Sequence, residues 1–354
     1  MQYLCDVIML TWNQLETTKV CIESYLVNTL VPTRLIIIDN ASNESTRQYL
    51  SSLRSTANCK IKVIFNKENV GFVRGMNQGI EISDAPYTCL ANNDLIFTNG
   101  WLNEIIEVFG KYKNLGVINP NSNSLGVAPG KDIFLESFAD RLKEENRGKF
   151  IEMPYCIGFC MVIRKQVIEK IGGLSDEFYP MFFEDTDYSL RANRAGYLIG
   201  MAKASYVVHN EHSSTGKIGT KKEEIFCKSK ETFVKKWGRM LRVALVIKDE
   251  KSLDNILGEA VELARNGNFI RVFVKNLKED SKVIFRKNNF NEHSGIKFIK
   301  YKSILGLMWK ILKKKKRYDV IVSNSRNLNA LFTKLAYKTL EILNKEEIYK
   351  IKMS

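Results

Sequence analysis

Short apolar runs alternate with helical segments along the first 120 residues, and this alternation constrains the fold more than any other feature. Four runs rich in apolar and β-branched residues predict strands, at residues 5–10, 35–39, 61–65 and 87–91. Residues 15–28 and 72–82 have the apolar spacing of helices. Strands that are apolar on both sides and joined by helices form parallel sheets covered on both faces. We therefore predict an α/β fold around a parallel sheet.

The alternation weakens between residues 110 and 153, and it restarts near Arg242. Beyond that residue, strands are predicted at 242–247, 269–274 and 318–325, and helices at 253–265, 303–316 and 328–343. A chain of 354 residues is long enough for about two domains. We predict one domain at residues 1–240 and a smaller α/β module at 241–354.

Positive charge is concentrated in the second module. The whole chain has a net charge of +15, and residues 241–354 contain 25 Lys and Arg against 12 Asp and Glu. This asymmetry indicates a module with a partner of its own. An amphipathic stretch at 305–317 ends in KKKKR and can lie on anionic lipid, where each basic residue adds about 1 kcal/mol. The alternative is a buried helix whose basic last turn complements the helix dipole.

The N-terminus and the cysteines indicate the compartment. The first residues, MQYLCDVIMLTWNQ, carry Asp6 and lack the basic flank and cleavage site of a signal peptide. No uncharged run approaches the roughly 18 residues of a membrane helix. Seven cysteines, an odd number, favour reduced thiols. We expect a cytoplasmic protein, peripheral at the inner face of the cell membrane if 305–317 binds lipid.

Polar residues follow the predicted strands at the edge where α/β sheets bind ligands. Thr11 follows the first strand, Asp39 ends the second, and Asn92, Asn93 and Asp94 follow the fourth. Asp39 also fits an Asx turn or a helix cap, and the NND sequence also fits a polar turn. A single carboxylate such as Asp94 is sufficient for Mg²⁺ or Mn²⁺ when substrate phosphates complete the metal's coordination.

Two later segments supply further candidates. FFEDTDYSLR places Glu184, Asp185 and Asp187 at the start of a helix, where a carboxylate can act as a general base. Acids also favour helix N-termini, and Asp187 is spaced to pair with Arg191. His209 and His212 follow a predicted strand, and a neutral imidazole can bind a metal, although most surface histidines bind none.

Glycines at 71, 75 and 79 recur every four residues in GFVRGMNQG. This spacing is neither GxGxxG nor a P-loop, so the dinucleotide-binding and P-loop fingerprints are absent from it. We predict a helix that packs closely on the sheet.

The order of these motifs is more specific than any one of them. TWN, DNAS, NVGFVRGMNQGI, NND, IGGLSDEFYPMFFEDTDYSLRANRAGY and VVHNEHSST, in this order, resemble the inverting family 2 glycosyltransferases. The resemblance covers about Leu4 to Gly238 and is closest to rhamnosyltransferase-like members that build bacterial surface polysaccharides. It implies a GT-A fold, which is Rossmann-like and binds a nucleotide-sugar.

The resemblance also implies a reaction and its residues. A sugar would pass with inversion from a nucleoside-diphosphate-sugar to a hydroxyl of a glycan or lipid-linked acceptor, as in hexosyltransferases and rhamnosyltransferases. The implied catalytic base is Asp185, with Glu184 in support, and the implied ligands of Mn²⁺ or Mg²⁺ are Asp94 and His209. The implied donor-binding residues are Thr11, Asp39, Asn77, Asn92 and Asn93.

The second module has a weaker resemblance. YDVIVSNS is similar to strands in the N-terminal half of GT-B glycosyltransferases, but about 110 residues leave no room for the other half. We therefore expect an accessory module, partial GT-B-like or Rossmann-like, and no second active site.

Two other classes of function compete with the glycosyltransferase. The charge of +15 suggests a nucleic-acid-binding protein, but the charge avoids the region with the site motifs, so we expect no nucleic-acid partner. A nucleotidyltransferase on a similar fold would need a glycine-rich basic loop near the first strand, and the sequence has none there.

Overall fold

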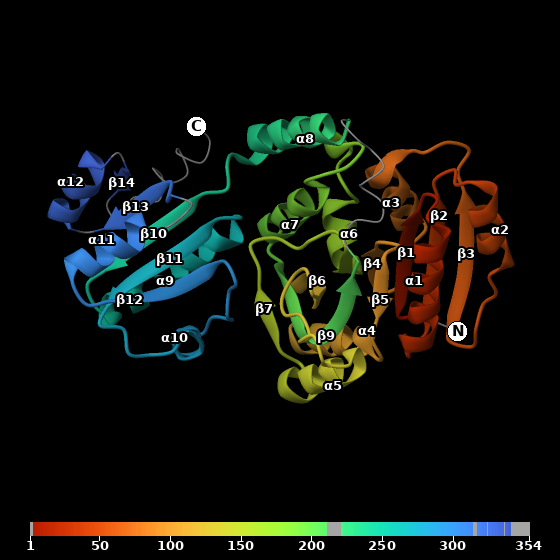
Figure 1. Cartoon of the computed structure of the whole chain (residues 1–354), viewed down its shortest axis with the longest axis horizontal. Coiled ribbons are helices and arrows are strands. Elements are labelled where there is room, and N and C mark those ends of the chain that lie inside the picture. Colours follow the sequence, from red (N-terminus) through yellow and green to blue (C-terminus); the bar gives the residue numbers. More distant parts are fainter. Residues whose placement is uncertain (1–2, 211–220, 314–316, 324, 336, 341–354) are drawn as a thin grey trace. The chain divides into compact units, whose positions relative to one another are not determined.

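The computed structural model describes residues 3–210, 221–313, 317–323, 325–335 and 337–340 (Figure 1). The chain divides into two compact units, Met1–Phe150 with Tyr155–Thr232 and Ile151–Pro154 with Phe233–Ser354. Each unit contains its own sheet with helices. The predicted α/β class, with a smaller second module, is therefore confirmed.

Strands and helices alternate through the first unit. Up to residue 237, the elements in chain order are β1 (Cys5–Thr11), α1 (Leu15–Asn28), β2 (Thr33–Asp39), α2 (Glu44–Ser52), β3 (Cys59–Phe65), α3 (Gly71–Glu81), β4 (Tyr87–Ala91), β5 (Leu95–Phe97), α4 (Trp101–Lys111), β6 (Leu115–Asn121), α5 (Leu135–Asn146), β7 (Phe150–Glu152), β8 (Cys160–Arg164), α6 (Lys165–Ile171), η1 (Asp176–Phe178), α7 (Glu184–Arg194), β9 (Leu198–His209) and α8 (Lys221–Trp237).

The four strands predicted in the first 120 residues are parallel to one another, as expected, but the complete sheet is mixed. Its order is β3-β2-β1-β4-β8-β6-β9-β5. The first four strands are parallel, but β8 is antiparallel to both β4 and β6, and β5 is antiparallel to β9. A strand buried on both faces has the same apolar pattern in either direction, so the sequence did not reveal these reversals. β6 was not predicted because Gly116 and Pro120 weaken its strand pattern.

Alternate residues of β1 face opposite layers of helices. Val7 and Met9 belong to a core shared with α1 and α4. Ile8 faces the other way, toward α3, where a Cβ on Gly79 would lie 2.4 Å from its side chain. A Cβ on Gly75 would likewise lie 2.5 Å from Leu10. The predicted close packing of this glycine-rich helix on the sheet is confirmed.

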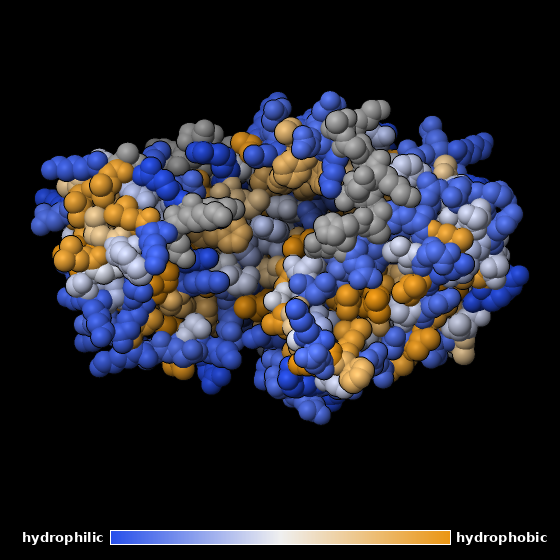
Figure 2. All heavy atoms as spheres, viewed as in Figure 1, coloured by the Kyte–Doolittle hydropathy of each residue, from blue (hydrophilic) through white to orange (hydrophobic). Residues whose placement is uncertain are grey.

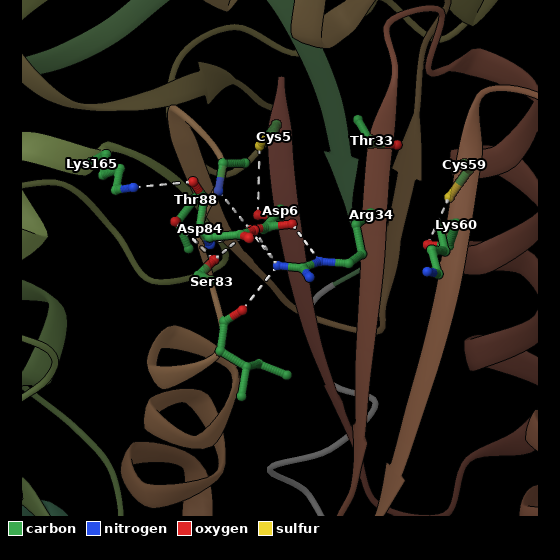
Figure 3. Close-up of polar contacts among 12 residues, drawn as sticks. Cys5, Asp6, Thr33, Arg34, Cys59, Lys60, Ser83, Asp84, Thr88 and Lys165 are labelled. Atoms are coloured by element: carbon green, nitrogen blue, oxygen red, sulfur yellow. Dashed lines mark hydrogen bonds and ion pairs between the residues drawn. The ribbon is translucent and has the colours of Figure 1, made fainter. Parts of the chain in front are cut away.

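A buried carboxylate organises the edge of the sheet where β1 begins (Figure 3). Asp6 is fully buried and accepts hydrogen bonds from Nε and Nη2 of Arg34 at 2.8 and 2.9 Å. Ser83 Oγ and the amides of Asp84 and Ala85 complete its hydrogen bonds, at 3.1, 2.8 and 3.0 Å. This network ties the loop before β4 to β1 and β2, at the edge opposite the carboxyl ends of the strands.

The second unit is a parallel sheet with helices on both faces. Beyond α8, its elements are β10 (Arg242–Ile247), α9 (Glu250–Arg265), β11 (Phe269–Lys275), α10 (Ser281–Lys287), β12 (Ile296–Tyr301), α11 (Ile304–Leu312), β13 (Val320–Ser323), α12 (Arg326–Lys334) and β14 (Lys338–Leu340). The strand order is β12-β11-β10-β13-β14, and all pairs are parallel. α9 and α10 pack with Val243 and Leu245, while α11 and α12 pack with Ala244 and Val246.

The predicted helix at 328–343 was wrong in its second half. α12 ends at Lys334, and residues 338–340 form β14 beside β13. The buried ring of Tyr337 packs against Phe332, so tertiary burial decides the conformation after Lys334.

Candidate functional site

A cavity of about 460 Å³ lies in the first unit, where β1 and β4 end and α7 begins. This is the position expected for a ligand in an α/β sheet. Six of the residues that the sequence indicated line it: Thr11, Asn92, Asn93, Glu184, Asp185 and His209. The cavity volume is in the usual range for a small-molecule site.

Asp94 lies beside His209, which lines this cavity. β5 and β9 pair so that Leu95 lies opposite His209, and this register carries Asp94 to the end of β9. Nε2 of His209 is 3.4 Å from Oδ1 of Asp94, and Nδ1 is 3.3 Å from Oγ of Ser124. The imidazole stacks on Phe159, with ring centroids 5.1 Å apart. The contacts fix the ring plane and direct Nε2 toward the carboxylate.

This pair has the chemistry of a partial metal site. Carboxylate oxygen and imidazole nitrogen both bind Mn²⁺, and adjacent ligands on an octahedral ion lie about 3 Å apart. The observed separation of 3.4 Å is close to that value. Among the described residues, no group of three or more His, Cys, Asp or Glu could hold a metal. The residues fit an ion whose remaining ligands are substrate oxygens and water. His212 lies outside the described residues.

A buried polar network supports the turn after β4. Nδ2 of Asn93 donates to Oγ1 of Thr18 at 2.9 Å and lies 3.4 Å from Oγ1 of Thr11. The two threonine hydroxyls are 3.1 Å apart. Asn92 lines the cavity, and its amide donates to the carbonyl of Phe159. Asn93 therefore holds the ends of β1 and β4 together, next to the cavity.

Two other residues indicated by the sequence have structural contacts and do not line the cavity. Asp39 is fully buried, and it accepts hydrogen bonds from the amide of Ser42 and from Arg47. Its neighbour Asn40 lines the cavity instead. The side-chain amide of Asn77 bonds both the N–H and the C=O of Leu174.

Glu184 and Asp185 are adjacent in sequence but differ in their hydrogen bonds. Oδ2 of Asp185 accepts from the amide of Gly158 at 2.8 Å, and Oδ1 accepts from the amide and hydroxyl of Thr186. Oε2 of Glu184 is buried and has no hydrogen-bond partner among the described residues. Burial raises the pKa of both carboxyls, to about 8 for Glu184, where the charge of Asp185 adds to the effect. The hydrogen bonds to Asp185 oppose the shift of its pKa, so Glu184 is the more readily protonated of the two.

The backbone leading into α7 is strained. Phe182 and Phe183 have φ of 76° and 67°, which side chains rarely adopt. Their neighbours are held on both sides: the carbonyl of Pro180 accepts from two amides at the start of α3, and Ser229 of α8 donates to the carbonyl of Met181. Phe226 of α8 also contacts both phenylalanine rings. This strain turns the start of α7 toward the cavity.

The predicted pair of Asp187 with Arg191 is confirmed, with Nε of Arg191 2.8 Å from Oδ2 of Asp187.

Sequence reasoning missed the apolar wall of the cavity. Besides Leu10, it is formed by Trp12, Phe72, Ile157, Phe159, Met181, Phe182 and Ile225. Trp12 follows Thr11 directly and is 37% exposed, so a large aromatic residue after a strand end was the available signal. The other apolar residues come from segments far apart in the chain, and no local pattern joins them.

The fold and the cavity define an α/β domain in which a cavity at the strand ends is lined by two carboxylates and by His209, the partner of Asp94. Residues 6–172 match the family model described as Glycosyl transferase family 2. This part of the chain therefore has the sequence features of a family 2 glycosyltransferase domain.

Curated relatives agree with this assignment at low identity. The low-salt glycan biosynthesis hexosyltransferase Agl10 of Haloferax volcanii is 25% identical over 190 residues, which are 50% of this chain and 58% of that protein. The chain therefore spans little more than half of that relative. The N-acetylglucosaminyl-diphospho-decaprenol L-rhamnosyltransferase of Mycobacterium tuberculosis is 23% identical over 217 residues, 52% of this chain and 69% of that protein.

Among solved structures, a mannosyltransferase of Pyrobaculum calidifontis in complex with GDP-Man and Mn²⁺ is similar. The match covers 61% of this chain and 59% of that one, with 13% identity and a TM-score of 0.46.

Proposed function

We propose that the first unit is a GT-A domain that transfers a sugar from a nucleoside-diphosphate-sugar to a hydroxyl group, with inversion. The observation that carries this proposal is that Asp185 and His209, the latter paired with Asp94, line one cavity. A carboxylate base can take the proton of the attacking hydroxyl, and a bound cation can stabilise the charge on the departing diphosphate, so together these groups suit a single displacement at an anomeric carbon.

Asp185 acts as the base in this mechanism. The acceptor oxygen attacks the anomeric carbon while its proton passes to the Asp185 carboxylate, and the bond from that carbon to the diphosphate oxygen breaks. Gly158 and Thr186 donate hydrogen bonds to this carboxylate and orient it. Glu184 retains its own proton near neutral pH, because burial and the adjacent charge raise its pKa. A second negative charge beside the base is thereby avoided.

Asp94 and His209 would hold the divalent ion, Mn²⁺ or Mg²⁺. Such an ion, when bound, neutralises the negative charge that develops on the departing nucleoside diphosphate. Ser124, 3.3 Å from Nδ1 of His209, helps to fix the orientation of the ring. Thr11, Asn92 and Asn93, beside the same cavity, would contact the donor. Trp12, directly after β1, offers an aromatic face on which the base of the donor nucleotide could stack.

The acceptor is proposed to be a glycan or a lipid-linked sugar, and the enzyme to act as a hexosyltransferase or rhamnosyltransferase in cell-surface polysaccharide synthesis. The names of the two relatives, one a glycan-biosynthesis hexosyltransferase and the other a rhamnosyltransferase of a diphospho-decaprenol, support this class. The apolar wall that includes Phe72 and Ile225 is compatible with the apolar part of such an acceptor.

Nucleotide release from a panel of UDP-, dTDP- and GDP-sugars tests the proposal, with Mn²⁺ or Mg²⁺ and with a lipid-linked sugar or glycan as acceptor. Asp185→Asn should bind the donor with unchanged affinity and lose transfer by about 10²-fold or more. Asp94→Ala should weaken donor binding only when the metal is present. Asp140→Asn, which removes an exposed carboxylate on α5, is the matched control and should change neither. Full transfer activity in Asp185→Asn would remove Asp185 as the base.

We further propose that the second unit docks on anionic membrane through α11. Leu307 and Ile311 face the core, but Ile304, Leu305 and Trp309 are 58%, 82% and 59% exposed, which is unusual for large apolar residues. Figure 2 shows hydrophobic residues gathered over α11 and α12. Lys313 lies over the ring of Trp309, so apolar and cationic groups adjoin, as in helices that lie at a bilayer surface. In the described part of the chain, no helix is long and apolar enough to cross a bilayer.

Vesicle flotation tests this docking. The protein should float with vesicles containing phosphatidylglycerol and not with phosphatidylcholine alone. The double variant Leu305→Asp and Trp309→Asp should stay unbound. Val283→Asp is the control, because Val283 is a 47% exposed apolar residue of α10 in the same unit. The proposal is contradicted if Val283→Asp loses vesicle binding to the same extent, or if the double variant still binds the vesicles. The basic run at 314–316 lies outside the described residues.

A further inference from the structure

The second unit contains a cavity of its own, of about 400 Å³. It lies at the carboxyl ends of β10, β11, β12 and β13, and it shares no lining residue with the cavity of the first unit. Its volume is in the range of small-molecule sites. The module expected from the sequence to be an accessory therefore has the space to bind a ligand.

The topology of the second sheet explains the position of this cavity. From β10 the chain winds outward through β11 to β12, and it then returns to add β13 and β14 on the other side of β10. The connections that leave β10 and β13 therefore diverge to opposite sides. Ligands of open parallel sheets bind in the crevice at such a reversal of strand order.

Two lysines make the cavity electropositive. Lys248 follows β10 and Lys275 ends β11, and both line the cavity. In the described part of the chain, neither ammonium group has an ion-pair or hydrogen-bond partner. The two acids that follow Lys248 do not line the cavity: Asp249 bonds the amide and hydroxyl of Ser252, and Glu250 bonds the amides of Lys278 and Glu279.

Hydroxyl groups add hydrogen-bond donors. Ser323 lines the cavity, is 2% exposed and accepts a hydrogen bond from the amide of Ser325 at 3.1 Å. Within the described residues, its hydroxyl proton has no acceptor. Ser303 and Ser325 also line the cavity, and they cap α11 and α12 by accepting from backbone amides. Both helices thus begin here, with the positive ends of their dipoles toward the cavity.

We propose that this cavity binds a small phosphate-bearing molecule. The phosphate is held by Lys248, Lys275 and the hydroxyl of Ser323, and the organic part packs against Ile304 and Leu328. Phosphate fits because it accepts several hydrogen bonds at once and its charge matches two lysines that have no acidic partner among the described residues. A soluble sugar phosphate and the headgroup of a phosphorylated lipid share this chemistry.

Calorimetric titration of the full chain at fixed ionic strength tests the proposal. The probes are inorganic phosphate, glucose 1-phosphate and dihexanoyl phosphatidic acid; the last two distinguish a soluble ester from a lipid headgroup by their relative affinity. Saturable binding of at least one probe is expected. The double variant Lys248→Ala and Lys275→Ala should weaken it by about tenfold or more, since charge-assisted hydrogen bonds are lost. Ser323→Ala, which removes only a hydroxyl, should weaken it severalfold.

The control is the double variant Lys297→Ala and Lys300→Ala. It removes two exposed lysines of β12 that do not line the cavity, and so the same net charge from the same unit. Its affinity should match that of the unaltered protein. Absence of saturable binding, unchanged affinity in the Lys248 and Lys275 variant, or equal loss in the control would each overturn the proposal.

Discussion

Two ion pairs in this protein have nearly identical geometry but differ in burial, and they allow a quantitative test of what holds the first sheet together. Arg34 binds Asp6 with Nε and Nη2 at 2.8 and 2.9 Å, and Arg74 binds Asp176 with the same atoms at the same distances. The Asp6 carboxylate is fully buried, whereas the side chains of Arg74 and Asp176 are 53% and 59% exposed.

The expected magnitudes follow from this difference. Arg34→Met keeps much of the aliphatic stem but leaves Asp6 as a buried charge without its cation, which costs about 3–5 kcal/mol. Arg74→Met removes a solvent-screened pair and an exposed contact with the Tyr179 ring, so it should cost much less. With a urea m-value of about 3 kcal/mol/M, the midpoint should fall by about 1–2 M for Arg34→Met, and it should fall far less for Arg74→Met.

The assay must report on the first unit alone, because a chain of two units need not unfold in one step. Hydrogen–deuterium exchange of β1 and β2 peptides across a urea series provides this readout. Adding Asp6→Asn to Arg34→Met should recover part of the loss, since the uncompensated charge is then removed. If Arg34→Met lowers the free energy of unfolding by no more than Arg74→Met does, burial does not explain the stabilisation by the pair of Arg34 with Asp6, and the reasoning is refuted.

Three further predictions concern the active-site acids, the glycine-rich helix and the metal. Glu184→Gln should retain most transfer activity at neutral pH, unlike Asp185→Asn. Because the pKa of Glu184 rises from 4.5 to about 8 on folding, the folded protein loses stability as the pH rises through that window, and urea titrations should show a weaker loss in Glu184→Gln. Gly79→Ala should cost about 1–3 kcal/mol by overpacking against Ile8, whereas Gly110→Ala, with open space at its Cβ, should be neutral or stabilising in thermal melts. Titration with Mn²⁺ should give a saturable calorimetric signal, and His209→Ala should weaken that binding by about tenfold.

Much of the candidate site could be predicted because it depends on strand ends. Thr11, Asn92 and Asn93 line the cavity, and each follows an apolar run that was visible in the sequence. Asp39 also follows such a run, but the amide of Ser42 and the guanidinium of Arg47 engage its carboxylate. Local pattern places a residue at the edge of a sheet, and only packing decides which way its side chain turns.

Patterns among residues close together in the sequence are sufficient to predict the α/β class, the positions of most strands and helices, the pair of Asp187 with Arg191 and the helix that packs through its glycines. These depend on residues within a few positions of one another, whose spacing is fixed by the helix and strand repeats. The tertiary structure decided the antiparallel direction of β8, the approach of His209 to Asp94, the unequal surroundings of Glu184 and Asp185, and the second cavity. Each of these joins segments distant along the chain, whose pairing, register and burial are set only when the whole core is packed.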